Sequence, residues 1–312
     1  MTKTPNRRAA IGLTAAAILA SCVDSKALSG EELTSDQSGP AGTWSPGVPL
    51  PFPVQEIYPC AHNSRLHLAG GFIAENGQIV GPTAAHHSWK PGETTWTQEV
   101  PLPVSRHHPQ LISWQKALLA YAGFESRSRD EAWMMQSTGW MQIGDPALDK
   151  EQSGVGRPWT PAAELPAPCA EAVLGITGDN MLHLAGGRTP NAVANGTWND
   201  HGDTDHHFVL SDLDGKWDSA APCLTKRNSA AGGTIGGNLH IVGGRTVGGG
   251  NVDRHEVYDF REDRWRTAAP MPQGQGGLAA TAVNGKLYAF GGEYFTDGGG
   301  VYPEAWAYDP VR

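Results

Sequence analysis

The apolar positions of this chain form a short pattern that returns five times. Each copy is an apolar run ending in a glycine pair or a near match, and the copies are LHLAGG (66–71), LLAYAGF (118–124), LHLAGG (182–187), LHIVGG (239–244) and LYAFGG (287–292). A tryptophan followed by proline alternates with it, in TWSPGVPLP (43–51), TWTQEVPLP (95–103), PWTPAAELP (158–166), KWDSAAP (216–222) and RWRTAAPMP (264–272). A period of roughly fifty to sixty residues predicts repeated units that bury their apolar faces against one another.

The pattern inside each unit predicts short antiparallel strands. Asn284-Gly285 separates two apolar stretches, which is a strong hairpin signal, and Gly178-Asp179-Asn180 and Gly236-Gly237-Asn238 stand at matching places. A third strand is expected after the glycine pair, at 206–213, 254–260 and 304–310, with His86-His87 in the matching strand of the first unit. The tryptophan segment supplies a fourth strand. Four such strands per unit, arranged radially, form a blade of a β-propeller.

The two ends of the repeat array complement each other. Only one predicted strand follows the last glycine pair, Gly291-Gly292, whereas Trp44 precedes the first unit. We therefore expect the strand around Trp44 to pair with the C-terminal blade and close the ring. Such pairing would remove two exposed sheet edges.

These features resemble the kelch repeat: a glycine doublet, an aromatic residue in the third strand (Tyr258, Tyr308) and a tryptophan before a proline. The resemblance extends over about residues 43–312 and implies an all-β, kelch-type β-propeller. Five blades are recognisable. Kelch propellers commonly have six or seven, and a sixth could lie in residues 125–157, after the second repeat in which Phe124 replaces the second glycine. No further doublet occurs there, which favours five.

The N-terminal segment is typical of an export signal. Lys3, Arg7 and Arg8 precede an apolar run that is too short to span a bilayer. The sequence LASC (19–22) resembles a bacterial lipobox, so residues 1–22 are predicted to be a signal peptide with lipidation at Cys22. Cleavage after Ala27 is the alternative, and the Arg7-Arg8 pair leaves both the Sec and the twin-arginine routes open.

The domain organisation and location follow from this assignment. Residues 23–42 are polar and are expected to form a flexible tether, followed by the propeller at 43–312. The protein is predicted to be exported to the periplasm or cell envelope. With a net charge of −9 and no basic cluster, it is not expected to bind nucleic acid, and it should meet a membrane only through Cys22.

Three further cysteines, Cys60, Cys169 and Cys223, allow at most one disulfide bridge among themselves. Cys169 and Cys223 stand at similar points of neighbouring units and are the favoured pair, although equivalent positions in neighbouring blades can lie beyond bonding distance.

Candidate ligand residues gather where the chain enters the first strand and leaves the second, because these segments share one rim of a propeller. Charged and polar residues at these places are predicted to converge on a central funnel. Glu293 is the leading acid-base candidate and Glu56 the second; the expected ligand-binding residues are Arg188, Arg245, Arg227, Arg106, His107 and Gln275. For any single residue, a solvated position or a hydrogen bond between blades is the ordinary alternative.

The histidine-rich segment HGDTDHH (201–207) carries imidazole and carboxylate groups, but its spacing matches no zinc or calcium loop. No metal site and no cofactor are therefore expected.

Two functions remain open. The favoured one is a non-catalytic module that binds a carbohydrate or a protein on its loop rim, since the fold supports many activities. The alternative comes from a distant resemblance to the sialic acid mutarotases (N-acetylneuraminate epimerases), which have six blades. This resemblance implies an isomerase that opens a sugar-acid ring with funnel glutamates and binds the carboxylate with arginines. A buried glutamate facing two arginines would favour the enzyme, and a wide aromatic rim would favour binding.

Overall fold

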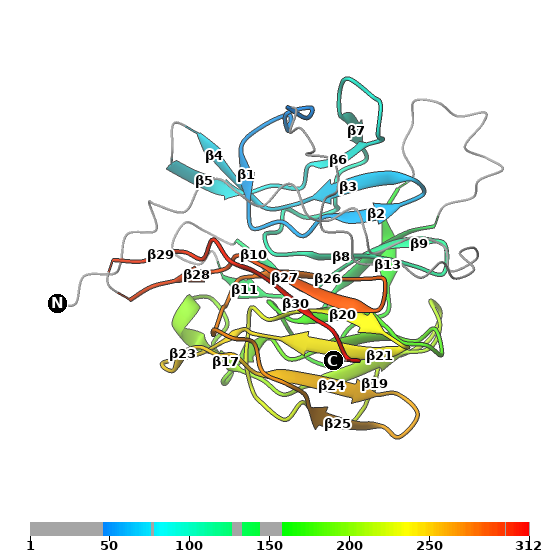
Figure 1. Ribbon diagram of the computed structural model, residues 1–312. Helices are drawn as coiled ribbons and strands as arrows, with labels where there is room; N and C mark the ends of the chain where they lie inside the picture. The colour runs from blue at the N-terminus through cyan, green and yellow to red at the C-terminus, as the bar shows by residue number, and fades with distance from the viewer. Residues whose placement is uncertain (1–45, 76–77, 127–132, 144–157, 297, 312) are drawn as a thin grey trace, which may run out of the picture.

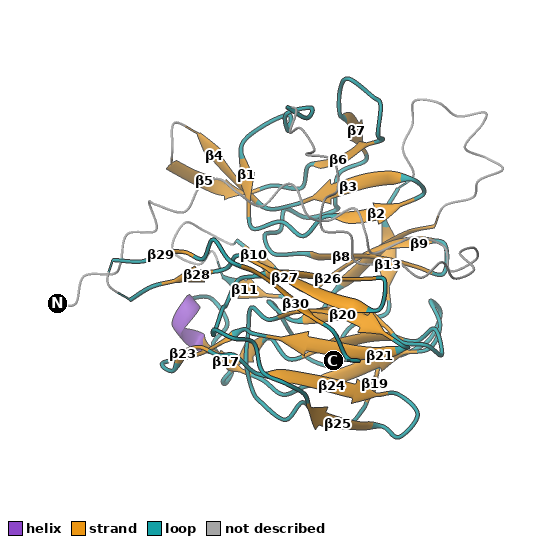
Figure 2. Ribbon diagram, in the orientation of Figure 1, coloured by secondary structure: helices purple, strands orange, loops and turns teal. Residues whose placement is uncertain are grey.

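A computed structural model describes residues 46–75, 78–126, 133–143, 158–296 and 298–311 (Figure 1). This part of the chain is almost entirely β-strand and turn, with one short 3-10 helix, η1 (Trp198–Asp200) (Figure 2). None of its helices has the length and apolar content needed to cross a membrane.

The repeats fold into antiparallel sheets that share one strand order. The first four sheets each have four strands. The first sheet consists of β2 (Cys60–His62), β3 (Arg65–Ala69), β6 (His86–Trp89) and β7 (Thr97–Glu99), and the second of β8 (Gln110–Trp114), β9 (Ala117–Tyr121), β12 (Gly139–Ile143) and β13 (Thr160–Ala162). The third sheet consists of β14 (Val173–Ile176), β15 (Leu182–Ala185), β18 (His207–Leu210) and β19 (Asp218–Ser219), and the fourth of β20 (Ala231–Ile235), β21 (Asn238–Val242), β24 (His255–Asp259) and β25 (Arg264–Thr267). The fifth has three described strands, β26 (Ala279–Val283), β27 (Lys286–Phe290) and β30 (Ala305–Tyr308). The all-β propeller architecture is thus confirmed.

Short accessory strands follow the glycine pairs and lie at one rim of the sheets. They are β4 (Phe72–Glu75), which pairs with β1 (Val54–Gln55) and β5 (Gln78–Pro82), and the hairpins β10 (Phe124–Glu125) with β11 (Met134–Met135), β16 (Arg188–Pro190) with β17 (His201–Asp203), β22 (Arg245–Thr246) with β23 (Gly250–Asn251), and β28 (Glu293–Tyr294) with β29 (Gly300–Val301). Each begins with the residue that directly follows a doublet. These hairpins therefore carry three of the predicted rim residues, Arg188, Arg245 and Glu293.

The turn chemistry explains the hairpins and the doublets. Asn284 and Gly285 join β26 to β27 with φ values of 51° and 74°, the conformation of a two-residue type I′ turn. In the doublets close packing also matters, because a Cβ on Gly187 would lie 2.5 Å from the carbonyl oxygen of Ala170. Glycine is therefore required there on both backbone and steric grounds.

The second repeat corrects one sequence-based alignment. Its doublet is Ala122-Gly123, with φ of 61° and 85°, so Ala122 adopts the left-handed conformation that glycine takes elsewhere. Phe124, and not Glu125, therefore occupies the position equivalent to Arg188, and Phe124 does not replace a glycine. The described residues 133–143 of the long stretch after it supply β11 and β12, and β12 is simply the third strand of this sheet.

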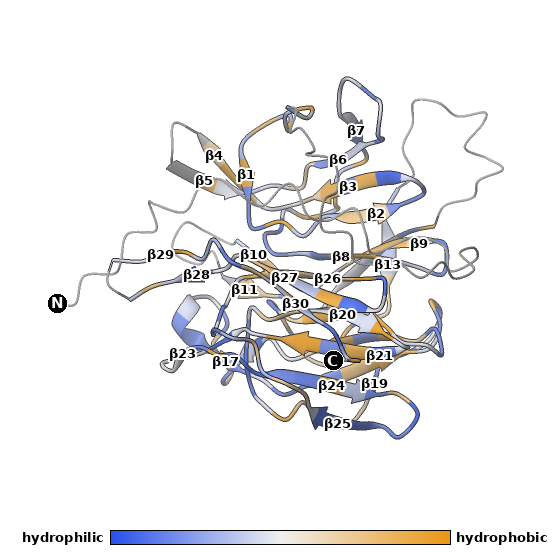
Figure 3. Cartoon of the chain, viewed as in Figure 1, coloured by the Kyte–Doolittle hydropathy of each residue, from blue (hydrophilic) through white to orange (hydrophobic). Residues whose placement is uncertain are grey.

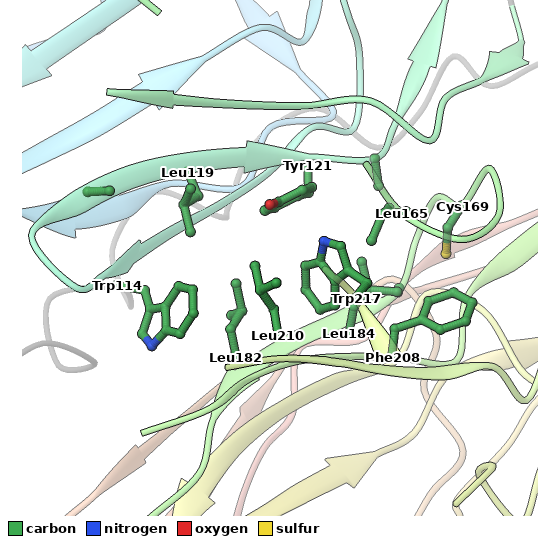
Figure 4. Close-up of a cluster of buried hydrophobic side chains, with 13 residues drawn as sticks. Trp114, Leu119, Tyr121, Leu165, Cys169, Leu182, Leu184, Phe208, Leu210 and Trp217 are labelled. Atoms are coloured by element: carbon green, nitrogen blue, oxygen red, sulfur yellow. The ribbon is translucent and has the colours of Figure 1, made fainter. Parts of the chain in front are cut away.

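Apolar side chains between neighbouring sheets form the core. Figure 4 shows the cluster between the second and third sheets, where Trp114, Leu119 and Tyr121 face Leu182, Leu184, Leu210 and Trp217. The rings of Tyr121 and Trp217 meet edge to face with centroids 5.2 Å apart. In Figure 3 the inner strand β21 is largely apolar and the outer strand β25 is polar. Burial between sheets thus stabilises the repeats, as the period predicts.

The described residues include only part of the segment that is predicted to close the ring. Residues 46–51 form no strand, and the carbonyl oxygen of Val48 accepts a hydrogen bond from Trp96 in the first sheet. Trp44 lies outside the described residues, as do residues 1–22 with Cys22 and the tether at 23–42. Pairing of the Trp44 segment with β30 therefore stays a prediction.

The predicted disulfide is absent: Cys60, Cys169 and Cys223 are all unbridged and buried. The Cys169 thiol lies 3.7 Å from the carbonyl oxygen of Gly186, and the backbone of Gly186 also hydrogen-bonds to the Cys223 thiol. Both thiols thus contact the backbone of Gly186 rather than each other. Burial raises the pKa of Cys169 and of Cys223 to about 12.

Candidate functional site at the channel mouth

One residue in each repeat adopts a left-handed backbone conformation just before the first strand of its sheet. These residues are Glu56, His108, Glu171, Ser229 and Gly277, with φ between 51° and 68°. Main-chain hydrogen bonds join neighbours in this set: the N–H of His108 donates to Glu56, that of Ser229 to Glu171 and that of Gly277 to Ser229, at 2.8 to 3.0 Å. Because first strands line the centre of a propeller, the set surrounds the mouth of the channel. We call these five residues the channel positions.

Two carboxylates flank one imidazole at three consecutive channel positions. The Nε2 atom of His108 lies 2.7 Å from Glu56 Oε2 and 3.6 Å from Glu171 Oε1. An ionised carboxylate only accepts hydrogen bonds, so Nε2 carries the hydrogen and donates it to Glu56. Glu171 is only 5% exposed, and its second oxygen, Oε2, is buried with no hydrogen-bond partner. A buried acceptor is thus available beside a hydrogen-bond donor.

His107 supports this arrangement from behind. Its Nδ1 lies 2.7 Å from Nδ1 of His108, and its ring is stacked between Phe72 and Phe124 with centroid distances of 3.9 and 5.0 Å. When His108 is neutral and donates through Nε2, its Nδ1 must accept, so His107 is the donor. His107 is fully buried. It therefore orients His108 and does not face solvent.

An ion pair occupies the fifth channel position, where Gly277 has no side chain. Arg245 Nη2 lies 2.9 Å from Glu293 Oε1, and the side chains are 15% and 34% exposed. A Cβ on Gly277 would lie 2.9 Å from Arg245 Nη2 and 3.3 Å from Glu293 Oε1. The pair therefore lies directly over Gly277. The ring of Phe295 covers the Arg245 guanidinium at 5.0 Å.

Tyr58 links the two halves of the mouth electrostatically. Burial, followed by the carboxylates of Glu171 and Glu56, raises the pKa of Tyr58 well above its usual value. Arg245 lowers this pKa and Glu293 raises it, so both groups act on the same hydroxyl. Tyr58 consequently keeps its proton at neutral pH.

Two of the predicted ligand-binding arginines make contacts within their own repeats. Arg106 donates to Glu125 Oε1 at 2.6 Å and to Thr138, and Arg227 donates to Glu256 Oε1 at 2.7 Å. Both arginines are 2% exposed or less. Gln275 holds the matching position of the fifth sheet, where its amide nitrogen and oxygen are buried without partners. These three side chains fasten or fill their own sheets.

Arg188 lies beneath a tryptophan. Its guanidinium is 3.5 Å from the centroid of the Trp198 ring, and Nη2 donates to the carbonyl oxygens of Trp198 and His201. The structure therefore does not set Arg188 across an open funnel from Arg245. Of the residues predicted from the sequence, it brings Glu56, Arg245 and Glu293 to the channel mouth and places His107 behind it.

The side chains of segment 201–207 diverge. His201 contacts Asn195, Asp203 accepts from Asn228 and from the N–H of Val247, and His207 pairs with His183. No group of three or more potential metal ligands occurs in the part of the chain that the structure describes.

His108 and Glu171 are among the residues that lead into first strands and are predicted to converge on the funnel, but neither they nor Tyr58 are among the catalytic or ligand-binding residues chosen from the sequence. A spacing signal could have identified the first two. The channel position stands 14 residues before the doublet in four repeats (56 and 70, 108 and 122, 229 and 243, 277 and 291) and 15 before it in the third (171 and 186). Aligning the repeats on this spacing, with Ala122 accepted as a doublet residue, groups all five. No comparable spacing in the sequence identifies Tyr58.

The fold and the repeated rim define a kelch-type β-propeller, and comparisons with known proteins agree. The Kelch motif matches residues 226–272. The chain is 26% identical to Kelch-like protein terF of Aspergillus terreus over 70% of its own length and 46% of that protein's, so it spans less than half of this relative. A solved structure described as "Structure of YjhT" superposes with a TM-score of 0.68 at 15% identity, covering 86% of each chain. At that identity the likeness shows the fold alone.

Proposed function

We propose that this protein binds a small, polyhydroxylated ligand of the carbohydrate class at the channel mouth. The observation that carries the proposal is the buried, unpartnered Glu171 Oε2 at a site to which several repeats contribute side chains. A buried acceptor without a donor costs about 1–3 kcal/mol, and a ligand hydroxyl or N–H group would relieve that cost. Function then follows from the side chains at the mouth and not from the fold.

The donor and acceptor pattern suits a sugar. Glu56, Glu171 and Glu293 accept hydrogen bonds, whereas Arg245 and the protonated Tyr58 hydroxyl can donate. A sugar ring presents hydroxyl groups that do both. A protein partner on the loop rim is the other form of binding; exposed Phe295 and Val247 on that rim favour it.

A second candidate is a mutarotase-like isomerase, and the Glu56–His108–Glu171 arrangement favours it. Ring opening needs one group to take the proton of the anomeric hydroxyl and another to donate a proton to the ring oxygen. Glu171 could act as the base, and His108 could act as the acid through Nε2–H in its imidazolium form, which returns to the neutral ring after the proton has passed to the ring oxygen. The buried glutamate expected of an enzyme is present, but Arg245 is the one arginine that the described structure brings to the mouth.

We also propose that the protein acts outside the cytoplasm and is tethered through Cys22. The support is the sequence LASC (19–22) with its preceding apolar run. Replacing Cys22 by alanine should release the protein from the membrane fraction. Equal membrane association of both forms would contradict lipidation.

A thermal-shift screen of the mature protein with neutral, amino and acidic monosaccharides tests the binding proposal. A ligand at 100 times its Kd stabilises the folded state by about 2.7 kcal/mol, which gives a clear rise in melting temperature. No shift with any of the three classes would refute carbohydrate binding. For each sugar that binds, line-shape NMR of its two anomers tests the isomerase, because catalysed exchange broadens both signals and simple binding does not speed their interconversion.

A further inference from the structure

Large apolar side chains that are exposed to solvent gather at one rim of the propeller. Of the nine in the described part of the chain, five lie on the accessory hairpins, namely Val80, Val193, Val247, Phe295 and Val301. Two more, Val104 and Leu224, lie in segments that lead into first strands. Single exposed apolar residues are ordinary on a protein surface, but their concentration at one place marks a contact surface.

The hairpins and the leading segments belong to the same rim. Isolated bridges join a leading segment to the start of a hairpin in four repeats, at His107 and Phe124, Ala170 and Arg188, Asn228 and Arg245, and Gly276 and Glu293. In Figure 1 the labels β5, β29, β23 and β17 all lie on the left side of the molecule. The turns at the opposite end are polar, as in Asn63-Ser64, Asp179-Asn180 and Asn284-Gly285. The two ends of the propeller therefore differ in polarity.

Polarity also changes along the hairpins themselves. Three of them begin with a charged residue directly after the doublet and reach an exposed apolar tip at Val193, Val247 or Phe295. The segments 78–82, 189–199 and 246–252 contain no charged residue, and 294–303 contains Asp297 alone, which lies outside the described residues. Three half-buried aromatic side chains flank these tips: Trp198, Tyr294 and Tyr302. Each hairpin thus changes from a charged base to an uncharged, apolar and aromatic tip.

We infer that this rim docks on the surface of a lipid bilayer, with the apolar tips inserted at the boundary between head groups and acyl chains. Uncharged tips avoid the cost of carrying charge into hydrocarbon, and tryptophan and tyrosine are enriched at the interface between membrane and water. The apolar area that enters this boundary supplies the binding free energy. The inference goes beyond the proposed ligand binding and does not depend on which ligand the channel mouth takes.

A bilayer suits the arrangement of the tips better than a protein partner does. The tips come from four separate hairpins, β4–β5, β16–β17, β22–β23 and β28–β29, and surround the channel mouth. A fluid lipid surface accepts separate insertions, whereas a protein interface needs a closely complementary surface. In the docked protein the channel mouth would face the lipid head groups.

The charge of the protein is compatible with an uncharged bilayer. The net charge of −9 and the lack of a basic cluster are the reasons why the sequence predicts membrane contact only through Cys22. Those reasons concern attraction to anionic lipids and not the insertion of apolar tips. If Cys22 is lipidated as proposed, a flexible chain of the length of residues 23–45 would hold the propeller within about 25 Å of the bilayer. The rim could therefore reach the membrane that holds the anchor.

Co-sedimentation with vesicles tests the inference, using the mature chain from residue 23 so that no lipid on Cys22 contributes. We expect the protein to partition into phosphatidylcholine vesicles. The partition should change little between about 0.1 and 1 M salt, because insertion of apolar groups is not screened. Adding phosphatidylglycerol should not strengthen it, since the protein is acidic.

Variants assign the binding to the tips. Val193→Asp and Val247→Asp each place a charge on a tip, so each should lower the partition coefficient at least threefold, and the double variant at least tenfold. Both side chains are exposed, so the melting temperature should not change. Val311→Asp is the matched control: Val311 is 91% exposed and Val193 101%, but Val311 follows β30 at the opposite end. It should leave the partition unchanged.

The outcomes decide the inference independently of the sugar screen. A partition that the double variant reduces and Val311→Asp does not would support docking through the rim. Absence of binding to vesicles of either composition would overturn the inference and leave the tips to a protein partner. Binding that is lost equally in Val311→Asp, or that requires phosphatidylglycerol and disappears in salt, would also overturn it. Failure of every sugar to bind would contradict the proposed function but would leave the vesicle result standing.

Discussion

The indole Nε1 of Trp96 donates a hydrogen bond to the carbonyl oxygen of Val48 at 3.4 Å. The same contact joins later neighbours, from Trp159 to Val100, from Trp217 to Ala163 and from Trp265 to Ala221, at 2.8 to 3.3 Å. Each of these acceptors stands four residues after the tryptophan of the preceding repeat (96 and 100, 159 and 163, 217 and 221), and Val48 stands four residues after Trp44. The first sheet thus contacts Val48 as the later sheets contact the equivalent residue of the preceding repeat.

A chain that starts at residue 54 should therefore be much less stable than one that starts at residue 43. Ala269 stands four residues after Trp265 and accepts from His255, yet no tryptophan within the described ranges donates to it. Trp44 is the tryptophan expected to fill this place. Urea unfolding of both chains measures the difference, and Trp44→Ala in the longer chain should give part of it. Equal midpoints for the two chains would contradict ring closure by this segment.

Hydrogen-bonded histidine pairs recur in three sheets and give a pH prediction. His67 with His86, His183 with His207, and His240 with His255 each join Nδ1 to Nε2 at 2.9 Å. The second histidine of each pair donates through its own Nδ1 to a backbone carbonyl, of Val100, Ala221 or Ala269. The Nε2 atom of this second histidine must therefore accept a hydrogen bond from the first histidine, so the ring of the second histidine is neutral.

Stability should fall as the pH drops below about 6.5. Burial is the main cause that lowers the pKa of His67 to about 3 and that of His86, His183, His207 and His240 to about 4. Between these pKa values and pH 6.5 the unfolded chain binds protons that the folded chain does not. Each histidine therefore lowers the free energy of unfolding by about 1.4 kcal/mol for each unit that the pH falls in this range. Urea titrations at pH 7.5, 6 and 5 measure it. A free energy of unfolding that is constant over this range would show that the rings do not stay neutral.

The arginines divide into structural and ligand-facing residues, and two substitutions should separate them. Arg227→Leu leaves the buried Glu256 carboxylate without its partner and should cost about 3–5 kcal/mol of stability. Arg245→Ala removes a partly exposed pair and should cost about 1 kcal/mol or less. Melting curves test both. Sugar affinity should change only with Arg245→Ala; an affinity loss in a fully folded Arg227→Leu protein would place Arg227 in the site.

The cysteines give a simple check of the interior. In the folded protein the thiols of Cys60, Cys169 and Cys223 should react very slowly with a thiol reagent, because all are buried and the pKa values of Cys169 and Cys223 are about 12. In denaturant without reductant all of them should react at once. A deficit of two thiols under those conditions would reveal a bridge that the structure does not have.

Much of the fold could be predicted from local patterns, because turns and strands are encoded by nearby residues. Asn284-Gly285 specifies its hairpin through backbone conformation alone, and the strand around Tyr258 appears where the aromatic pattern indicates. The role of Ala122 in the doublet could not be predicted, because nothing in the sequence indicates that this alanine adopts the left-handed conformation. The doublet of the second repeat was therefore placed one residue too late.

The side-chain directions at the rim could not be read in this way. Arg227 points into its sheet because it pairs with Glu256 on the third strand, 29 residues further along the chain. Arg245 instead lies over Gly277 and pairs with Glu293 of the next repeat. Partners of this kind are set by tertiary packing. Residue type at the rim therefore predicted that charged groups would gather there, but not which of them would face a ligand.

Main-chain hydrogen bonds fix the backbone of the channel positions. The side chains at these positions can therefore be substituted while the backbone around the channel mouth stays the same. A propeller of this kind can change its ligand by point substitution at Glu56, His108, Glu171 or Ser229 without rebuilding a loop. The left-handed φ restricts the choice: asparagine, aspartate and glycine enter with little strain, whereas valine, isoleucine and threonine do not. Ser229→Asp or Ser229→Asn is thus the least disruptive way to give the channel mouth a new specificity.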